Sequence, residues 1–592
     1  MPHVPQELLP PPPVLVSRSE ELGWLHQVQR TVAVVTGLPG VGKRALALTW
    51  AEAASAQYPD GQLHLDLADH AGPGGGFDPE SALAALLRSM GIPEADLPPS
   101  RAELGSRWRT LTARRRILLF LTGVRTEAQV RELLPGGHGS RVVVASQRRI
   151  HGLEHAEDLQ LAPLGEPGGI QLLAALAGEA RVAEDPAGAA ALVRRCAGLP
   201  AALRVVARML SRDRFLPLGR LAGRLGDGEL AGPVFEEAYQ QLGPEAQQLY
   251  RMLGQHELRE VSAELIGAFG LSGMEELLDA CLADQVGDGR YELHDLLLAH
   301  ARTVPGDPGE ASAALDRWTA ACHHYLNKAG HGAFAVTSPR RLTFAGRPAG
   351  ADPFGGSKAA AMGWFEAEYP AILAVARMSA LAGDGGLAWQ FADVLSAFFF
   401  NLRRRLDWIE LTRQGILAAA HSGRIDVEAR LRSLLSRALL TDDEAARESE
   451  LSVELAERAA HPLLLASVWE FRGRHLEAAG GAAEEAYRKS YELNLAAGDR
   501  RGAALAQLFL GRLTKDVALL RTAIAELDGD ERMIVRAKLA IGQLTGDQAL
   551  LAEAASYFAV NGMLTYEAEA LQSLGTDPAR LEEIRERLGL VS

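Results

Sequence analysis

The first 165 residues alternate short apolar runs with segments whose apolar residues recur every three or four positions. The runs predict strands at 31–36, 62–67, 116–121 and 141–146, with a further candidate at 158–164. The segments with the longer period predict helices at 45–58, 80–91 and 127–134. Strands that alternate with helices along a chain indicate a parallel sheet that is covered by helices on both faces.

From about Pro163 onward, helical spacing of the apolar residues replaces the strand pattern and continues to about residue 284. Residues 287–301 then predict a turn, a short strand and a helix. Segment 329–358 is rich in Gly and Pro, which favour irregular backbone, and it predicts a flexible loop or linker. The rest of the chain has helical periodicity almost to its end.

The last helical part contains a weak internal repeat. Segment 529–544 repeats the pattern of segment 498–513 at an offset of 31 residues, and segment 467–480 has a similar pattern. Each unit predicts a helix with a small residue where its neighbour must approach, followed by a second helix. Helix pairs of this size cannot bury their apolar faces alone, so they stack into a solenoid. An irregular helical bundle is the alternative interpretation.

Composition and charge narrow the class of protein. At 592 residues the chain exceeds the size of one core, and 47% hydrophobic with 23% charged residues is typical of soluble globular proteins. The sequence has neither a signal peptide nor a membrane-spanning run, so we predict a cytoplasmic protein with no membrane partner. The three cysteines are far apart, which predicts no disulfide framework and no metal cluster. The net charge of −14 argues against direct binding of nucleic acid.

The candidate chemistry lies in GLPGVGKR, residues 37–44. This stretch follows a predicted strand and precedes a predicted helix, as does a phosphate-binding P-loop of pattern G-x-x-x-x-G-K-[ST]. Arg44, however, stands where a Ser or Thr hydroxyl should hold Mg²⁺. The nucleotide contacts that this loop predicts come from Gly37, Gly40, Val41, Gly42, Lys43, Arg44 and Ala45.

Several further segments, in order along the chain, resemble motifs of one family. VPQELLPPPPVLVSRSEELGWL (4–25) resembles its leading segment, with Ser17-Arg18 in place of a Gly-Arg pair. TEAQVRELLPGGHGSRVVVASQRRI (126–150) resembles the stretch with its sensor strand. The segments that resemble its GLPL motif, its winged-helix motif and the helix before its repeats are CAGLPAAL (196–203), RYELHDL (290–296) and WFEAEYPAIL (364–373).

Taken together, nearly the whole chain resembles the STAND class of signal-transduction NTPases. Within that class it is most similar to the NB-ARC–tetratricopeptide proteins of actinomycetes, of which the AfsR-type antibiotic regulators are one branch. The resemblance implies an α/β P-loop NTPase-like domain followed by an all-α helical domain, a winged helix and a C-terminal TPR-like α-solenoid. The predicted segments are a leading segment (1–30), the P-loop domain (31–165), a small helical domain (166–228), the winged helix (229–305), a helix with the Gly/Pro-rich linker (306–358), a helical spacer (359–429) and the repeats (430–592).

The resemblance also implies a nucleotide held between the first three domains. Arg18 would then lie near the base or the ribose, and Pro200 would pack on the adenine. His294 would reach the phosphates from the winged helix. A buried histidine with a purely structural role is the alternative interpretation of His294.

Three departures from the family pattern fall on the chemistry of hydrolysis. Arg44 replaces the hydroxyl that holds Mg²⁺, and Thr122 stands where the third strand should end in carboxylates. Gln147 stands where the sensor strand should offer an Arg. Phosphoryl transfer depends on Mg²⁺ and on an oriented water. We therefore predict a pseudo-ATPase with no catalytic residues and no bound magnesium.

Binding of ADP or ATP does not require these groups. The amides of the loop and of the following helix form an anion site from the main chain, and the Arg44 guanidinium suits phosphate geometry. ADP or ATP without Mg²⁺ is therefore the predicted ligand. The alternative is a decayed loop that packs against its neighbours, with Arg44 paired to a carboxylate.

The family usually carries an effector domain before the leading segment, and this chain starts at that segment, so we expect it to act through another protein. The first hypothesis is a signalling scaffold whose repeats at 430–592 bind a protein partner, with regulation of secondary-metabolite production as the role that the AfsR branch implies. The second is an active ATPase switch that takes a metal ligand from another position, such as Asp66. The third is an accessory subunit of a biosynthetic enzyme. The sequence leaves open whether the chain forms an oligomer.

Overall fold

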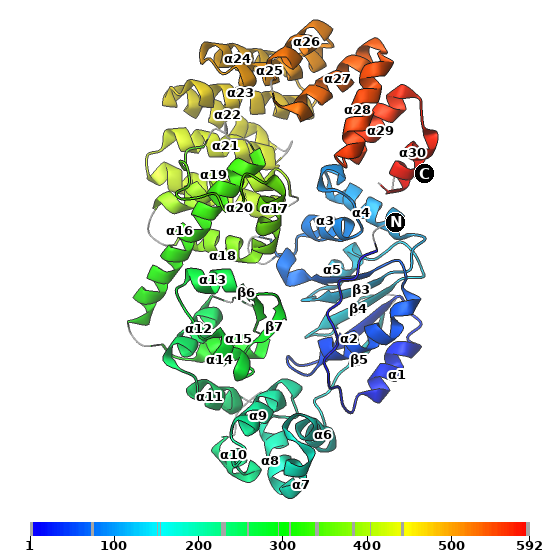
Figure 1. Cartoon of the computed structure of the whole chain (residues 1–592), viewed down its shortest axis with the longest axis vertical. Coiled ribbons are helices and arrows are strands. Elements are labelled where there is room, and N and C mark those ends of the chain that lie inside the picture. The colour runs from blue at the N-terminus through cyan, green and yellow to red at the C-terminus, as the bar shows by residue number, and fades with distance from the viewer. Residues whose placement is uncertain are drawn as a thin grey trace. The chain divides into compact units, whose positions relative to one another are not determined.

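The structure is a computed structural model that describes residues 4–72, 76–150, 152–153, 156–225, 232–256, 258, 260–293, 295–306, 309–337, 343–381, 385–402, 404–439, 443–527 and 529–587. The chain forms two compact units (Figure 1). Unit 1 combines Met1–Ala71 with Thr112–Ala321, and unit 2 combines Gly72–Leu111 with Cys322–Ser592.

Unit 1 contains a parallel five-stranded sheet (Figure 1). The strand order is β2-β3-β4-β1-β5. The chain therefore passes over other strands between β1 and β2 and between β4 and β5. All residues of β1 and β3 are buried, in keeping with their continuous apolar sequences. The bounds are β1 (Val32–Thr36), β2 (Gln62–Asp66), β3 (Leu118–Thr122), β4 (Arg141–Ser146) and β5 (Ala156–Gln160). The sheet confirms the prediction of an α/β domain with parallel strands.

The rest of unit 1 is mainly helical. A second, antiparallel sheet has the order β6-β8-β7, and it lies among helices in the segment for which we predicted a winged helix. The helices are α1 (Ser19–Gln27), α2 (Lys43–Ala54), α5 (Glu127–Glu132), α6 (Glu166–Ala177), α7 (Glu179–Glu184), α8 (Pro186–Arg195), α9 (Pro200–Arg212), α10 (Leu218–Arg224), α11 (Gly232–Gln240), α12 (Pro244–Gln255), α13 (Ala263–Ala268), α14 (Met274–Asp279) and α15 (Asp295–Thr303). The strands are β6 (Glu260–Ser262), β7 (Asp284–Gly287) and β8 (Arg290–Glu292).

Unit 2 is an array of helices, together with a segment that the sequence places between β2 and β3. No helix among the described residues is long and apolar enough to cross a membrane. The array comprises α16 (Glu310–Thr337, which begins in unit 1), α17 (Lys358–Ala367), α18 (Tyr369–Ser379), α19 (Gly385–Phe399), α20 (Arg405–His421), α21 (Ile425–Leu439), α22 (Asp443–Ala459), α23 (Pro462–Ala478), α24 (Glu484–Ala496), α25 (Arg500–Thr514), α26 (Val517–Glu526), α27 (Glu531–Thr545), α28 (Gln548–Val560), α29 (Leu564–Leu574) and α30 (Pro578–Arg587).

The repeat in the sequence corresponds to a repeated helix boundary. Gly498 and Gly529 have φ angles of 74° and 75°, a left-handed conformation that ends a helix and that Gly adopts without strain. The aspartate after each glycine then caps the next helix, since Asp499 accepts from the amide of Gly502 and Asp530 from that of Met533. The Gly-Asp pair therefore stops one helix and starts the next.

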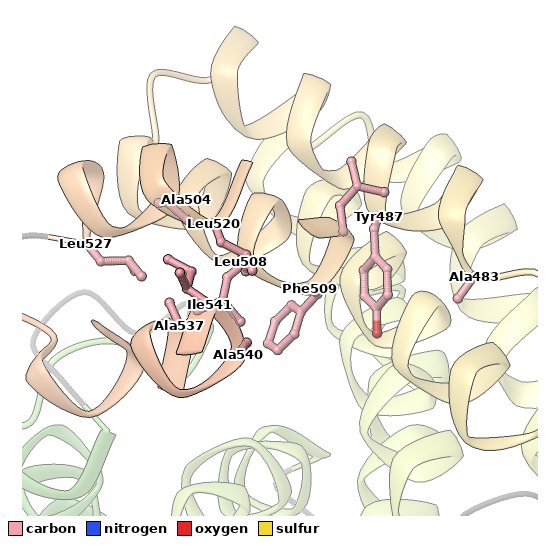
Figure 2. Close-up of a cluster of buried hydrophobic side chains, with 12 residues drawn as sticks. Ala483, Tyr487, Ala504, Leu508, Phe509, Leu520, Leu527, Ala537, Ala540 and Ile541 are labelled. Atoms are coloured by element: carbon pink, nitrogen blue, oxygen red, sulfur yellow. The ribbon is translucent and has the colours of Figure 1, made fainter. Parts of the chain in front are cut away.

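The small residue predicted within each repeat lies at a helix crossing. A Cβ on Gly542 would lie 2.8 Å from Leu551 of α28, and one on Gly511 would lie 3.1 Å from Leu519 of α26. These crossings adjoin a cluster of buried side chains from α24 to α27, in which the ring of Tyr487 is fully buried and stacks on Phe509 at 5.6 Å (Figure 2). Neighbouring helix pairs thus share one core, as a stacked array requires.

The Gly/Pro-rich segment 329–358 is not wholly a flexible loop, which corrects that prediction. Helix α16 continues to Thr337, and Gly332 within it lets the ring of Phe398 approach, since a Cβ there would lie 2.7 Å from that ring. Farther on, the buried carboxylate of Asp393 accepts from the hydroxyl of Thr343 at 2.7 Å and from the amide of Phe344 at 2.9 Å. The glycine in this helix serves close packing rather than mobility.

Segment 72–111 packs with the helical array, although the sequence places it between two strands of the sheet. It contains α3 (Pro79–Ser89), the short 3-10 helix η4 (Glu94–Asp96) and most of α4 (Arg101–Thr112). The predicted P-loop domain spans 31–165, and segment 72–111 within that range belongs to unit 2. The segment contacts the array at two separate places.

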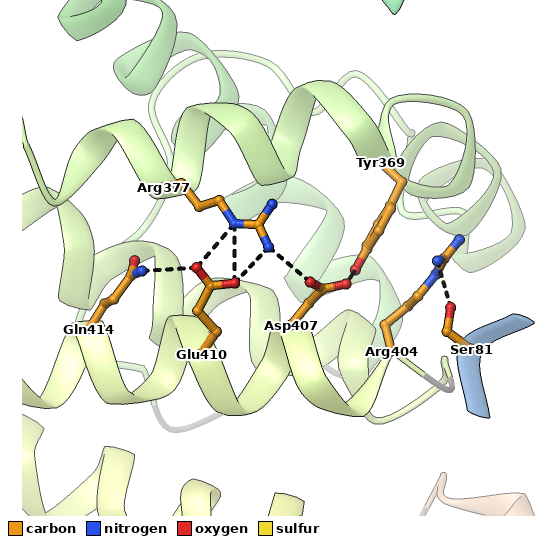
Figure 3. Close-up of polar contacts among 7 residues, drawn as sticks. All are labelled: Ser81, Tyr369, Arg377, Arg404, Asp407, Glu410 and Gln414. Atoms are coloured by element: carbon orange, nitrogen blue, oxygen red, sulfur yellow. Dashed lines mark hydrogen bonds and ion pairs between the residues drawn. The ribbon is translucent and has the colours of Figure 1, made fainter. Parts of the chain in front are cut away.

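The first contact lies near the beginning of the array (Figure 3). Arg404 donates to the hydroxyl of Ser81 on α3 at 2.7 Å, and its guanidinium lies 4.5 Å from the centre of the Tyr369 ring. Tyr369 in turn donates to the buried carboxylate of Asp407, which also forms an ion pair with Arg377 at 3.2 Å. A polar network of α18 and α20 therefore holds α3.

The second contact lies near the end of the array. The carboxylate of Asp96, which is 4% exposed, accepts from the amides of Leu564 at 2.8 Å and Thr565 at 2.5 Å. These are the first amides of α29, whose own N-cap residue, Met563, supplies no side-chain acceptor. Asp96 therefore caps a helix 468 positions away in the sequence.

Candidate nucleotide-binding site

The candidate site is the loop of residues 37–42 between β1 and α2, where the sequence predicted a P-loop. Gly40 and Gly42 have φ angles of 72° and 99°, which only Gly adopts without strain. A Cβ on Gly37 would lie 2.5 Å from the carbonyl oxygen of Leu161, so no larger residue fits there. Helix α2 begins at Lys43, and its first amides therefore have no acceptor within the helix. This geometry provides a main-chain anion site.

Both cations at the start of α2 have partners within unit 1, Lys43 in the loop itself and Arg44 on a distant strand. The ammonium of Lys43 donates to the carbonyl oxygens of Gly37 and Leu38, at 2.9 Å each. The guanidinium of Arg44 forms an ion pair with Glu292 of β8, with 2.9 Å between Nη1 and Oε2. The alternative that Arg44 pairs with a carboxylate therefore describes the structure, and that carboxylate lies 248 positions away in the sequence.

Arg18 lies against the same loop. It is 7% exposed, and it donates to the carbonyl oxygens of Ala162 at 2.7 Å and Val41 at 3.4 Å. An ion pair with Glu21 at 2.8 Å completes its contacts. Arg18 thus links the leading segment to the P-loop and to the segment that follows β5.

The GLPL-like motif also contacts the loop. The amide of Ala201 donates to the carbonyl oxygen of Gly40 at 3.3 Å, and Pro200 Cγ lies 3.9 Å from where a Cβ on Gly42 would be. A Cβ on Gly40 would lie 2.7 Å from Leu296 of α15. Most of the predicted contact residues therefore lie together: Arg18, Gly37, Gly40, Val41, Gly42, Lys43, Arg44, Ala45 and Pro200. His294 lies outside the described residues.

Ion pairs join α9 to the small antiparallel sheet and its neighbouring helix. Arg204 contacts both carboxylate oxygens of Asp284 on β7, at 2.7 and 3.3 Å, and Arg208 contacts Asp279 on α14 at 2.6 Å. Partial burial opposes the charge of Arg204, but Asp284 outweighs it and raises the pKa of the guanidinium. These pairs fix α9, which carries Pro200 at its start, against α14 and β7, and β7 pairs with β8, which carries Glu292.

The positions of the expected magnesium ligands do not fit that ion. Arg44 is a cation, and Thr122 at the end of β3 shares a hydrogen bond of 3.2 Å with His64. Asp66, the alternative ligand, pairs in register with Thr122 but accepts from the amide of Ala68 at 2.9 Å. Beyond β4, Gln147 is exposed. The donor set of this loop thus suits a phosphate anion but not a hydrated divalent cation.

An open depression of about 420 Å³ lies in unit 1 where the chain leaves β3 and β4. Its lining includes Arg125 and Arg149, and Arg149 donates to the side chain of Gln160 at 2.9 Å. The hydroxyl of Ser146, at the end of β4, donates to the carbonyl oxygen of Val124. The arginine that follows β4 therefore lies at the rim of this depression, displaced from the position that the sensor pattern predicts.

Sequence reasoning missed the residues that close the site. Glu292 and Leu296 lie in the RYELHDL segment, whose sequence alone indicates no role for either. The one available signal was the unusual Arg44, because a cation at a hydroxyl position requires a nearby anion when it is partly buried. That signal indicates a carboxylate, but it does not say which one.

Comparison with known proteins gives relatives in both sequence and structure. No family model matches the chain. It is 30% identical over 482 residues to the regulatory protein AfsR of Streptomyces coelicolor, a match that covers 75% of this chain and 47% of that protein. It is 31% identical over 398 residues to the regulatory protein AfsR of Streptomyces griseus, covering 62% of this chain and 39% of that protein. The chain thus spans less than half the length of these relatives.

Among solved structures, the chain resembles a STAND protein with a tetratricopeptide repeat sensor from Pyrococcus horikoshii. The TM-score is 0.57 at 14% identity, and the match covers 98% of this chain and 90% of that one. This likeness shows the fold: a P-loop module joined to a helical repeat array. The chain therefore belongs to the AfsR-like proteins. Its fold resembles that of a STAND protein with a repeat sensor.

Proposed function

We propose that the chain is a regulator whose P-loop binds ADP or ATP without Mg²⁺ and without hydrolysis, and which acts through a protein bound by its helical repeats. The observation that carries the proposal is the ion pair of Arg44 with Glu292 at the position of the missing magnesium ligand. In this view the small antiparallel sheet with its helices is the family's winged helix. Regulation of secondary metabolism is the role that the AfsR relatives suggest.

The donor set of the loop supports phosphate binding. The first amides of α2 have no acceptor within the helix, and Lys43 and Arg44 add two positive charges beside them. Hydrogen bonds to charged groups contribute about 1.5–3 kcal/mol each, so four or five suffice for micromolar affinity of roughly 8 kcal/mol. Lys43 would have to leave the carbonyl oxygens of its own loop in order to take part.

The ion pair gives the site a means of switching without turnover. A phosphate at the loop and the carboxylate of Glu292 would compete for the same Arg44 guanidinium. When phosphate takes Arg44, Glu292 is released, and β8 loses its ion pair to the start of α2. The bound state would thus loosen one contact between the P-loop and the winged helix, and no bond of the nucleotide would be broken.

The test is a calorimetric titration of the full chain with ADP and with ATP, in EDTA and in Mg²⁺. We expect similar affinities in both solutions, a loss of about 10-fold in Arg44→Ala, and a gain of roughly 3- to 5-fold in Glu292→Gln, which removes the competitor. Glu275→Gln is the matched control, since Glu275 is exposed on α14.

Two results would contradict the proposal. One is a large gain of affinity on adding Mg²⁺. The other is sustained phosphate release from ATP that Lys43→Ala abolishes, which would identify an active ATPase. If neither nucleotide binds, the loop is a structural contact only.

A further inference from the structure

The helices of the array form two layers, and one layer faces inward. From α21 to α27, each odd-numbered helix packs against the next odd-numbered helix more extensively than the even-numbered helices pack against one another. In a curved stack the layer at the smaller radius has the closer spacing. The odd-numbered helices therefore line the concave side of the array.

Arginines and aromatic rings alternate along this inner layer. The guanidinium of Arg437 on α21 lies 5.4 Å from the ring centre of Phe400 and 6.0 Å from that of Phe471. Arg474 on α23 lies 5.6 Å from Phe471 and 4.4 Å from Phe509 of α25. The rings of Phe400 and Phe471, which both contact Arg437, are parallel, with 6.2 Å between their centres. These are cation–π distances, and a cation–π contact does not use up the N–H groups of a guanidinium.

The cationic row continues along the later helices. Arg536 on α27 lies 5.1 Å from the ring centre of Tyr566 on α29. Its pKa is lowered by partial burial, and the positive charges of Arg512, Arg532 and Arg474 lower it further. Arginines from three successive inner helices are thus close enough to repel one another. We call this set the inner arginine face: Phe400, Arg437, Phe471, Arg474, Phe509, Arg512, Arg532, Arg536 and Tyr566.

Solvent reaches this face although protein surrounds it. Arg437 and Arg532 are exposed side chains, and Phe400 is 37% exposed. Yet desolvation by the surrounding helices, with the charge of Arg474, lowers the pKa of Arg437 to about 10. Arg437 is thus surrounded by protein and still reaches the surface of the array.

The positive charge of the face is only partly neutralised within the chain. Glu470 pairs with Arg474 and Glu477 pairs with Arg512, at 2.5 and 2.6 Å. Within the part of the chain that the structure describes, no carboxylate lies at ion-pair distance from Arg437 or Arg536. This excess of cations stands out in a chain whose net charge is −14.

We infer that the inner arginine face is a docking surface for an acidic peptide segment of a partner protein. This inference rests on the proposed function, since it names the chemistry of the partner that the repeats bind. Carboxylates of the segment pair with Arg437 and Arg536, and its apolar side chains cover the exposed ring of Phe400. The occupant is identified by charge complementarity and by the aromatic floor between the cations.

A peptide fits this face better than a nucleic acid does. The two carboxylates of α23, Glu470 and Glu477, lie among the arginines and would repel a continuous row of phosphates. The net charge of −14 also opposes a polyanion, whereas a short peptide carries only a few negative charges. Spaced carboxylates match two separated arginines without contacting the glutamates.

The experiment measures fluorescence anisotropy of a fluorescein-labelled peptide of Glu-Glu-Leu-Ser repeats with the full chain. The peptide should bind, should be weakened by added salt, and should bind at least about 10-fold more tightly than a matched peptide of Gln-Gln-Leu-Ser repeats. This comparison needs no variant of the protein. Equal binding of the two peptides would overturn the inference.

Variants locate the site. Arg437→Gln and Arg536→Gln should each weaken the acidic peptide about 10-fold, whereas Arg521→Gln, the same change at an exposed arginine on the even-numbered helix α26, should leave it unchanged. Wild-type affinity in both inner variants would overturn the inference, and so would tighter binding of an oligo-dT strand than of the peptide. None of these changes touches the P-loop, so the nucleotide titration fails or succeeds independently.

Discussion

Arginine has opposite roles in the two units of this molecule. In unit 1, Arg44 replaces a metal-binding hydroxyl, and Glu292 neutralises its charge within the chain. In unit 2, Arg437 and Arg536 lie at cation–π distance from aromatic rings and have no carboxylate at ion-pair distance among the described residues. The same side chain thus closes one site and keeps another open. What decides between the two is whether the fold supplies a counter-charge.

The presence or absence of a counter-charge determines what a ligand must displace at each site. An anion that approaches the P-loop has to displace Glu292 from Arg44, and the cost of breaking that ion pair reduces its affinity. An anion that approaches the inner arginine face displaces only water and relieves the repulsion among the arginines. The inner face should therefore be the more sensitive to the charge of its ligand.

The largest expected effect comes from breaking the array beneath the inner arginine face. Tyr487 is fully buried, so Tyr487→Ala removes a ring from the core and should cost about 4 kcal/mol of unit 2 stability. Hydrogen exchange followed by mass spectrometry should show faster exchange from α23 to α27, and binding of the acidic peptide should be lost. Exchange in β1 to β5 should not change.

The control for that variant is Tyr491→Ala, on the same helix, where the side chain is only partly buried. It should change exchange far less than Tyr487→Ala does. Faster exchange of the parallel sheet in Tyr487→Ala would mean that the two units unfold together. Mutations could then not test the stability of one unit independently of the other.

The next effect separates the two kinds of arginine directly. Arg44→Glu places two carboxylates together and should destabilise unit 1 by about 1–2 kcal/mol, and adding Glu292→Arg should recover most of that loss. Arg437→Glu breaks no ion pair and should cost less than about half as much. Urea denaturation gives each value. A double variant no more stable than Arg44→Glu alone would show that the ion pair contributes nothing.

A smaller effect is expected where Asp96 caps α29. Asp96→Ala leaves two amides of the first turn without their acceptor and should cost about 1–2 kcal/mol. Hydrogen exchange should speed up in α29 and also in segment 94–111. Asp547 is the N-cap residue directly before α28, so Asp547→Ala should affect α28 only. Identical exchange patterns in the two variants would contradict a bridging role for Asp96.

The smallest effect is a pH dependence at Asp407. Burial raises the pKa of this carboxyl above its ordinary value of 3.8, although Tyr369 and Arg377 act in the opposite direction. The folded chain therefore holds this proton more tightly than the unfolded chain, and the group favours folding more as pH falls from the raised pKa toward 3.8. Asp407→Asn should consequently cost more stability at acidic pH than at neutral pH. Urea titrations at both pH values check this, and a cost that grows with pH would contradict it.

The features that the sequence predicted well are those with local causes. The strand–loop–helix order of the P-loop follows from an apolar run, three glycines and a helical period within a short stretch. The Gly-Asp pairs of the repeat are visible for the same reason, because each pair ends one helix and caps the next. Such signals need no knowledge of distant residues.

The features that the sequence did not predict depend on contacts between distant positions. Nothing near Arg44 identifies Glu292 as its partner, and nothing near Asp96 indicates that it caps α29. The prediction of a flexible loop failed over Ala329–Thr337 because glycine has two uses. At Gly332 the missing side chain makes room for Phe398 within a continuous helix, and composition does not distinguish that use from mobility.

The two contacts of segment 72–111 also limit how this protein can evolve. Repeat arrays commonly lengthen or shorten by duplication or loss of whole units, since each unit contacts only its neighbours. Here, gaining or losing a unit between α20 and α29 would move the start of α29 away from Asp96, while the bond of Arg404 to Ser81 would remain. The number of helix pairs is therefore constrained by a segment that lies outside the repeats in the sequence. Relatives of different array length should carry a different segment between the second and third strands.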